Sequence, residues 1–278
     1  MRIARTDEGL AVAHPEGGWA SLADLGITAQ DTAEVIAQDA VIRRALDGAP
    51  PGREDVTLRC PVVRPSKVLA IGLNYMDHIR ETNAPTPERP VLFAKFPNSL
   101  NDPFGDVVMG PALTEQGDYE VELAVVIGSP ARKVTLGAAL DHVYGYTVAN
   151  DVSARDAQRR DGQLARSKSF DTFCPIGPWI TTADEVPNPQ TLAIRAWVNG
   201  EIRQDSSTKE MAYSVAELIE FLSRGMTLEP GDVILTGTPH GVGFAMDPPR
   251  YLAPGDVVRC EIEGLGAIEN HVIGAEAG

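Results

Sequence analysis

The chain has 278 residues, with 24 Lys and Arg against 39 Asp and Glu, a formal charge of −15 and a pI near 4.7. Such an acidic surface repels phosphate backbones and anionic lipid headgroups, which disfavours nucleic-acid and membrane partners. No apolar run approaches the roughly 18 residues of a membrane span, and the start lacks the apolar core of a secretion signal. Three scattered cysteines, Cys60, Cys174 and Cys260, fit buried thiols in a reducing compartment. We therefore expect a cytoplasmic protein.

Residues 1–64 predict a small N-terminal domain that contains a hairpin and a helix. Alternating apolar residues on both sides of Thr6-Asp7-Glu8-Gly9 are typical of a hairpin. Asp31-Thr32-Ala33-Glu34 has the spacing of a capping box, an apolar stripe continues to Leu46, and Gly48-Ala49-Pro50-Pro51-Gly52 ends the helix. Nothing in this segment suggests chemistry.

Residues 65–278 predict a second, β-rich domain. Tight turns are favoured over crossover helices because the 26 Gly and 21 Pro gather between short apolar runs. The expected class is therefore mixed α+β rather than doubly wound. The predicted strands cover Val68–Ile71, Val91–Phe93, Val121–Ile127, Tyr144–Val148, Ala193–Val198, Val233–Leu235 and Val257–Ile262.

One clear helix is predicted late in the chain. Ser214-Val215-Ala216-Glu217 has the spacing of a second capping box, and Gly225 follows at the other end. We expect this helix to cover a sheet, because its apolar residues fall on one face: Met211, Val215, Leu218, Ile219 and Leu222.

His78 and Glu81 follow the first of these strands and are three residues apart. If the segment is helical, they lie on one face, where a carboxylate raises the basicity of the imidazole and fixes its tautomer. This arrangement suits a general base that takes a proton from water. The alternative is a surface ion pair. The proline-bounded loop from Thr82 to Pro90 favours the functional interpretation, because such a loop can close over a site.

Glu120 and Glu122 form the most informative pair. A strand's period of two puts them on one face, roughly 7 Å apart at Cα. Two carboxylates so close in a half-buried site raise each other's pKa or need a cation, and Mg²⁺ or Mn²⁺ prefers oxygen ligands. The alternative is a solvent-facing strand.

Asp151 ends a later apolar segment and is a third carboxylate that can face the first two. It is also a good N-cap for the next turn, which is the structural alternative. Arg155 and Gln158 lie one and two turns further along the same predicted helix start, so both reach a site if Asp151 does.

Two lysines and a glycine-rich turn complete the candidate residues. Lys168 and Lys95 have apolar neighbours and could balance an anion, although an exposed loop lysine is the ordinary explanation. The turn at residues 235–243 is neither a Walker A loop nor a Rossmann fingerprint, but its backbone N–H groups and Thr238 could hold a carboxylate.

Taken in order, six motifs resemble the fumarylacetoacetate hydrolase family over residues 67–273. The motifs are Ile71-Gly72-Leu73-Asn74-Tyr75 with Asp77-His78, Tyr119-Glu120-Val121-Glu122-Leu123, Asn150-Asp151-Val152-Ser153-Ala154-Arg155-Asp156, Lys168-Ser169-Phe170-Asp171, Pro175-Ile176-Gly177-Pro178 and Leu235-Thr236-Gly237-Thr238-Pro239. Several motifs in one order are far more specific than any one alone. The resemblance implies a roll of mixed β-sheets, usually a homodimer, preceded by the short N-terminal segment of bacterial members.

The resemblance also implies a role for each candidate residue. A divalent metal, Mg²⁺ or Mn²⁺, is expected on Glu120, Glu122 and Asp151. A lid carrying His78 and Glu81 is expected over the site, with Lys168 stabilising substrate charge. The expected substrate-binding residues are Tyr75, Lys95, Arg155, Gln158 and Thr238.

The leading functional prediction is hydrolysis of the C–C bond of a 2,4-diketo acid, such as an acylpyruvate or a sugar-derived relative. His78 would activate the attacking water, and the metal with Lys168 would stabilise the released enolate. Two alternatives keep the same site: isomerisation of a 2-oxohept-ene-1,7-dioate and decarboxylation of oxaloacetate. A third, from another class, is a metal-stabilised binding module without turnover.

Overall fold

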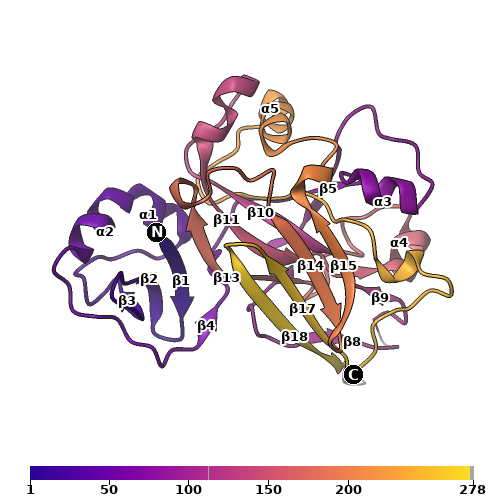
Figure 1. The fold of residues 1–278 in the computed structure, drawn as a ribbon, viewed down its shortest axis with the longest axis horizontal. Helices are drawn as coiled ribbons and strands as arrows, with labels where there is room; N and C mark the ends of the chain where they lie inside the picture. The colour runs from indigo at the N-terminus through magenta and orange to yellow at the C-terminus, as the bar shows by residue number, and fades with distance from the viewer. Residues whose placement is uncertain (112, 276–278) are drawn as a thin grey trace.

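The computed structural model describes residues 1–111 and 113–275 and is dominated by an 11-stranded sheet (Figure 1). Its strands are β1 (Arg2–Thr6), β2 (Gly9–Ala13), β3 (Trp19–Ser21), β4 (Leu58–Arg59), β5 (Val68–Gly72), β6 (Val91–Lys95), β7 (Leu100–Asn101), β10 (Val121–Ile127), β11 (Val143–Asn150), β13 (Cys174–Thr182) and β16 (Val233–Leu235). The main path runs β3-β2-β1-β13-β11-β10-β16-β5-β6, with β4 beside β1 and β7 beside β13.

A second, five-stranded sheet and a two-stranded ribbon complete the strands. The second sheet contains β8 (Val107–Met109), β14 (Ala193–Val198), β15 (Glu201–Ser207), β17 (Val257–Ile262) and β18 (Gly266–Gly274), in the order β15-β14-β17-β18-β8. The ribbon pairs β9 (Gly117–Asp118) with β12 (Ser153–Ala154). Most of the pairings are antiparallel, so the predicted β-rich α+β class is confirmed.

The helices are few and short. They are α1 (Thr32–Ala37), α2 (Asp39–Leu46), α3 (Met76–Glu81), α4 (Arg155–Asp161) and α5 (Val215–Gly225), with 3₁₀ turns at Pro97–Ser99, Leu136–His142, Ala183–Glu185, Thr208–Glu210 and Gly243–Ala245. Within the described residues, no helix is long and apolar enough to cross a membrane.

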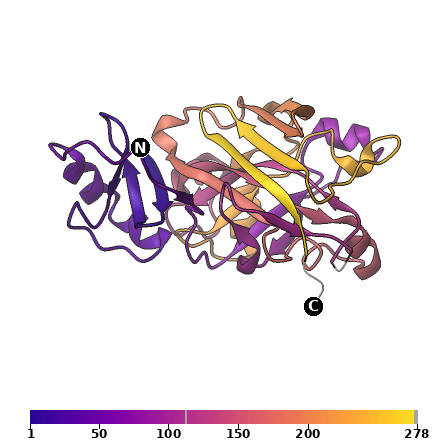
Figure 2. The ribbon, with the colours of Figure 1, turned by 90° about the horizontal axis from the view of Figure 1, so that it is seen from below.

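The N-terminal segment forms one end of the molecule in both ribbon views (Figures 1 and 2). The predicted hairpin is present as β1 and β2, closed by the pair Thr6 and Gly9. Strand β1 also pairs with β13, so this segment extends the large sheet. The predicted helix is interrupted at Gln38, and the Asp31 side chain caps α1 by accepting from the Glu34 N–H. A domain boundary near residue 64 stays a prediction.

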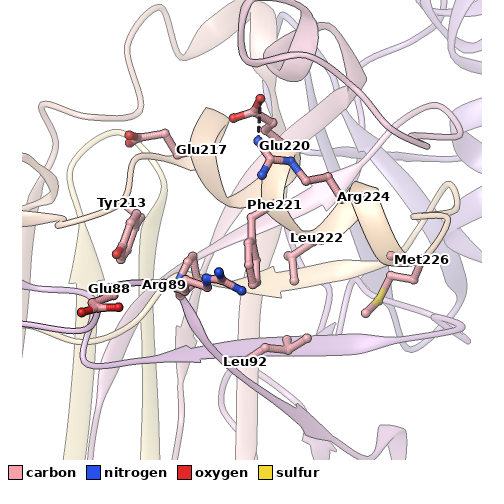
Figure 3. A pocket seen from close by; sticks show the side chains of 12 residues that line it. Glu88, Arg89, Leu92, Tyr213, Glu217, Glu220, Phe221, Leu222, Arg224 and Met226 are labelled. Carbon is pink, nitrogen blue, oxygen red and sulfur yellow. Dashed lines mark ion pairs between the residues drawn. The ribbon is translucent and has the colours of Figure 1, made fainter.

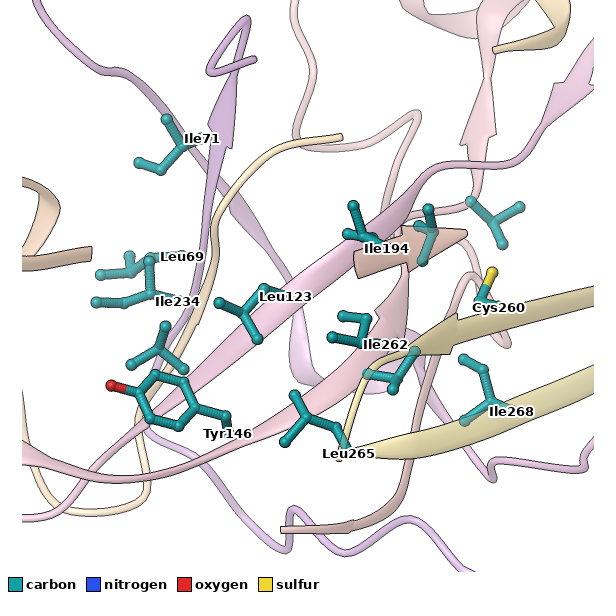
Figure 4. Packing of buried hydrophobic residues seen from close by; sticks show 14 of the residues in the cluster. Leu69, Ile71, Leu123, Tyr146, Ile194, Ile234, Cys260, Ile262, Leu265 and Ile268 are labelled. Carbon is teal, nitrogen blue, oxygen red and sulfur yellow. The ribbon is translucent and has the colours of Figure 1, made fainter. Parts of the chain in front are cut away.

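Two apolar cores lie against opposite faces of the large sheet. Alternation along β10 sends Leu123 and Val125 into one core and Ala124 and Val126 into the other. The first core joins the two sheets, as Figure 4 shows for Leu69, Leu123, Tyr146, Ile194, Cys260, Ile262, Leu265 and Ile268. All seven residues of β10 are buried, so a polar side chain on this strand needs a partner.

Four strand ends meet at one edge of the large sheet and position the functional residues. Strands β10 and β11 are antiparallel, and their ladder ends at the pair Val121 and Asn150. The next residues beyond this pair, Glu120 and Asp151, therefore lie next to each other. Strand β16 is antiparallel to β10 and parallel to β5, so the glycine-rich turn and α3 also begin at this edge. Residues far apart in sequence are thereby brought together.

The capping box of α5 gives a direct test of the local sequence prediction. Both of its reciprocal bonds are present between Ser214 and Glu217. Ser214→Ala is expected to lower the free energy of unfolding by about 1 kcal/mol, while Ser214→Thr keeps the hydroxyl and most of the stability. Denaturant titration of both variants measures this. Equal losses in the two would show that the hydroxyl does not carry the effect.

Candidate active site

The three predicted metal ligands converge at the sheet edge. Glu120, Glu122 and Asp151 each place a carboxylate oxygen within 4.8 Å of the others, and all three residues are buried. Glu120 stands directly before β10, Glu122 is in it, and Asp151 follows β11. The backbone N–H of Asp151 donates to the Glu120 carbonyl at 2.8 Å, which ties the two segments together. The exposed-strand alternative for the glutamates is wrong, and Asp151 caps no helix.

Two buried lysines neutralise part of this cluster. Lys168 Nζ donates to Glu120 Oε2 and to Asp151 Oδ2, both at 2.7 Å. Lys95 Nζ donates to Asp151 Oδ1 at 2.7 Å and to the Phe173 carbonyl at 3.0 Å, and it also reaches the Lys168 carbonyl. Lys95 therefore holds a candidate metal ligand and the backbone of the second lysine in place.

Arg155 supplies the third cation and connects Glu120 to a fourth carboxylate. Its Nη2 donates to Glu120 Oε1 at 2.5 Å, its Nε to Asp118 Oδ2 at 2.9 Å, and its Nη1 to Gln158 Oε1 at 3.3 Å. Its guanidinium lies 4.5 Å from the ring centroid of Phe244. Each donor nitrogen of this side chain therefore has a protein acceptor.

The predicted pair of His78 and Glu81 is formed on α3. His78 Nδ1 lies 3.1 Å from Glu81 Oε2, and the Gly241 N–H donates to Glu81 Oε1 at 2.8 Å. A carboxylate acceptor favours the proton on Nδ1, which leaves Nε2 as the free ring nitrogen. The segment is helical, as this pairing required, and forms α3.

The glycine-rich turn donates its N–H groups to the protein's own carboxylates. The Gly237 N–H donates to Glu122 Oε2 at 2.7 Å, and the N–H groups of Gly243 and Phe244 donate to Asp118 at 2.8 and 3.1 Å. Thr238 donates to the Val121 carbonyl at 2.9 Å. The turn therefore holds carboxylates, as its composition suggests, but these are internal ones.

One cavity of about 220 Å³ gathers most of the candidate residues. It is lined by Ile71, Gly72, Leu73, His78, Val91, Phe93, Glu120, Glu122, Arg155, Gln158, Leu164, Lys168, Thr238 and Phe244. Tyr75 and Lys95 are buried and are not among these lining residues. The structure therefore does not place Tyr75 or Lys95 where a substrate in this cavity would touch them. Arg155, Gln158 and Thr238 do line the cavity, and their contact with substrate stays a prediction.

Sequence reasoning missed Asp118 and Phe244. Asp118 lies two residues before Glu120, so the alternation that singled out the glutamates also includes it. No pattern marks Phe244, because its contact with Arg155 joins segments far apart in the chain.

The electrostatics distinguish Glu122 from its neighbours. Burial, the Asp151 charge and the Glu120 charge raise the pKa of Glu122 well above its usual range. Burial also opposes the ionisation of Glu120, but Lys168 and Arg155 outweigh it and lower its pKa to about 2. Among the described residues, no lysine or arginine forms an ion pair with Glu122. The cluster thus contains one buried carboxylate that lacks a cation.

These residues fit a divalent metal ion. Hard cations take oxygen ligands, and the three carboxylates supply them from a compact, buried set beside a cavity. Such an ion would also supply the positive charge that Glu122 lacks.

A larger cavity of about 690 Å³ lies between α5 and residues 88–92, which end the proline-bounded loop and begin β6. Figure 3 shows its apolar side chains, among them Leu92, Phe221 and Met226, with charged residues around them. None of the lining residues belongs to the carboxylate cluster or to the pair on α3. The smaller cavity is therefore the candidate active site.

Comparisons with known proteins agree with this arrangement. The family model described as Fumarylacetoacetate (FAA) hydrolase C-terminal matches residues 67–273. The chain belongs to the fumarylacetoacetate hydrolase family. Members of this family are enzymes, and the protein is accordingly an enzyme. The resemblance inferred from the six motifs is confirmed.

Relatives within the family carry different activities in their names. The mitochondrial oxaloacetate tautomerase FAHD2A of Bos taurus is 48% identical over 237 residues, which cover 84% of this chain and 75% of that protein. A putative HpcE protein from Mycobacterium smegmatis has a TM-score of 0.92 and 35% identity, covering 99% of this chain and 100% of the other. Maleylpyruvate hydrolase from Sphingobium, solved with manganese(II) and pyruvate, has a TM-score of 0.82 and 33% identity, with 99% and 100% coverage. A cytoplasmic location stays a prediction.

Replacement of Glu122 tests the metal site through stability. In metal-free protein the folded state keeps a proton on Glu122 that the unfolded chain loses above the ordinary pKa of 4.5. Stability therefore falls as pH rises above that value, by up to about 1.4 kcal/mol per pH unit for this one group. Glu122→Gln removes the ionisation, so its thermal unfolding is expected to lack this fall.

The same variant is expected to lose the stabilisation that Mn²⁺ or Mg²⁺ gives the wild type, since a ligand of the folded state raises Tm. Glu54→Gln, at an exposed glutamate of the N-terminal segment, is the matched control. A metal-induced rise in Tm that is equal in Glu122→Gln and wild type would contradict the assignment.

Proposed function

We propose that the protein transfers a proton between carbon and oxygen of an enolisable 2-oxo acid, with oxaloacetate as the first substrate to test. The observation that carries the proposal is that Glu120, Glu122 and His78 line one cavity of about 220 Å³, with a carboxylate oxygen of Asp151 within 4.8 Å of those of both glutamates. This volume is below the roughly 300–1,000 Å³ of pockets for drug-sized ligands, which suits a small acid. The names of two relatives, oxaloacetate tautomerase and maleylpyruvate hydrolase, support a keto-acid substrate.

The proposed metal is Mg²⁺ or Mn²⁺ on Glu120, Glu122 and Asp151. When bound, it supplies Lewis acidity that favours the enolate form of a 2-oxo acid. The bound manganese in the maleylpyruvate hydrolase structure supports this choice.

The protein's own groups then provide the proton transfer. The free Nε2 of His78, which is oriented by Glu81, can take the O–H proton of the enol and return it to C3 to give the ketone, or move a proton from C3 to the oxygen in the reverse direction. Lys168 keeps its positive charge although burial opposes it, because Asp151 and Glu120 raise its pKa. This ammonium stabilises negative charge on the enolate oxygen. Phe244 and Leu164 contribute apolar side chains to the cavity lining.

Hydrolysis of a 2,4-diketo acid, the leading prediction from the sequence, is the second candidate. The same His78 nitrogen can take a proton from a water molecule that attacks the 4-keto carbon. The relative that is named a maleylpyruvate hydrolase favours it. An experiment must also separate these two candidates from three others: isomerisation of a 2-oxohept-ene-1,7-dioate, decarboxylation of oxaloacetate, and a binding module without catalysis.

Loss of the imidazole tests the proposed function. With Mg²⁺ or Mn²⁺ present, the wild type should accelerate the decay of the enol absorbance of oxaloacetate above the rate with metal alone. His78→Ala should lower this acceleration by about 10²–10⁴-fold, the usual contribution of a general acid or base. His271→Ala, at an exposed histidine in β18, should have no effect.

The products separate the candidates. Tautomerisation leaves the total oxaloacetate unchanged, decarboxylation releases CO₂ and pyruvate, and acylpyruvate hydrolysis releases pyruvate and a second carboxylic acid. A wild type that leaves the enol decay at the background rate, yet hydrolyses acylpyruvates, would replace the first proposal with the second. Stabilisation by metal without turnover of any of these acids would favour the binding module.

We also propose that the protein is a homodimer, as the resemblance implied. Five large apolar side chains are exposed within residues 91–113, and the most exposed are Phe96 at 51% and Phe104 at 53%. Clusters of exposed apolar residues are typical of interfaces.

Light scattering after size exclusion should give twice the chain mass of 29.8 kDa. The double substitution Phe96→Ser and Phe104→Ser should shift this mass toward the monomer, while Ile202→Ser, at an exposed residue of β15, should not. A monomeric wild type at micromolar concentration would refute the dimer.

A further inference from the structure

Asp118 is a fully buried carboxylate that has no part in the proposed proton transfer. It is the last residue of β9 and is not among the residues that line the cavity. Four donors converge on it. Its Oδ1 accepts from the N–H groups of Tyr119 at 3.0 Å and Gly243 at 2.8 Å, and its Oδ2 from Phe244 N–H at 3.1 Å and Arg155 Nε at 2.9 Å.

These bonds connect Asp118 to the wall of the active site. Arg155 lines the cavity, donates to Glu120 and Gln158, and stacks on Phe244. Asp118 holds the Nε side of that guanidinium and the backbone of Phe244 at the same time. The Phe244 ring in turn lies edge-on to His78, with 6.2 Å between the centroids.

We propose that Asp118 is a positioning residue that fixes Arg155 and Phe244, so that the guanidinium can bind the carboxylate end of the substrate. This inference rests on the proposed function for the identity of the substrate. Nη1 is the guanidinium nitrogen left with the weakest protein partner, at 3.3 Å from Gln158, and is therefore the donor that a substrate oxygen meets.

The chemistry of the four donors explains why this position carries a carboxylate. An asparagine has one acceptor oxygen, so whichever way its amide is turned, the NH₂ group faces two N–H donors. A neutral residue also leaves Arg155 with one fewer charged partner in a buried site. Asp118→Asn should therefore loosen Arg155 while keeping the shape of the side chain.

Asp232 provides a matched control on the opposite edge of the sheet. It is also fully buried and also accepts from four donors: Ser66 Oγ, Lys67 N–H, Lys67 Nζ and Glu229 N–H. It precedes β16, whereas the site lies beyond the end of that strand. Asp232→Asn thus removes the same kind of charge without touching the cavity.

The experiment measures the binding of pyruvate to Mn²⁺-loaded protein by calorimetry, together with Tm and the steady-state constants for oxaloacetate. The Tm of both variants should be lower than that of the wild type. Asp118→Asn should weaken pyruvate binding about tenfold, which is about 1.4 kcal/mol, and raise KM for oxaloacetate by a similar factor. Asp232→Asn should change neither quantity by more than about twofold. Equal pyruvate affinities in the two variants would overturn the inference.

A double-mutant cycle identifies the route of the effect. If Asp118 acts through Arg155, adding Asp118→Asn to Arg155→Gln should weaken pyruvate binding no further, and additive losses would refute this. If Asp118→Asn does not fold, Phe244→Leu, which removes the ring beneath the guanidinium, should weaken pyruvate binding, and unchanged affinity would overturn the inference.

Because pyruvate binding requires no turnover, the two proposals can fail separately. A wild type that binds pyruvate but leaves the enol decay of oxaloacetate at the background rate contradicts only the proposed reaction. A wild type that binds no pyruvate yet accelerates the enol decay contradicts only the inference about Asp118.

Discussion

The structure depends on a group of charges buried at one edge of the large sheet. Four carboxylates, on Asp118, Glu120, Glu122 and Asp151, meet three cations, and only Glu122 is without one. Burying charges is costly unless each is paired and hydrogen-bonded. The ends of β10, β11, β16 and β5 supply the partners, so the order of the strands in the sheet determines the site.

The glycine-rich turn after β16 is the second element on which the site depends. Its N–H groups bind one carboxylate of the metal cluster, one of the histidine pair and Asp118. Gly241 adopts a φ of +95°, and a Cβ there would lie 1.9 Å from the Arg203 carbonyl oxygen. Only glycine allows this approach. The turn thus connects Glu81 on α3 to Glu122 of the carboxylate cluster through two backbone N–H groups.

The overall charge of −15 and the local charge of the site have different consequences. The surface charge disfavours the binding of polyanions, because a polyanion is repelled by many acidic groups at once. At the site, ionisation of all four carboxylates leaves one negative charge, that of Glu122, unbalanced by Lys168, Lys95 and Arg155, and a divalent ion makes the sum positive. A small keto acid can therefore bind within an acidic protein.

The sequence by itself determined the β-rich class, the exact limits of β10, β14, β16 and β17, the α5 cap and the metal-ligand candidates, because alternation and capping are local properties. It missed β13, whose Pro175 and Pro178 are typical of loops. Only the tertiary structure decided that Lys95 holds Asp151 rather than lining the cavity, and that Asp118 holds Arg155. Contacts between residues far apart in the chain depend on strand order and register, which no local pattern contains.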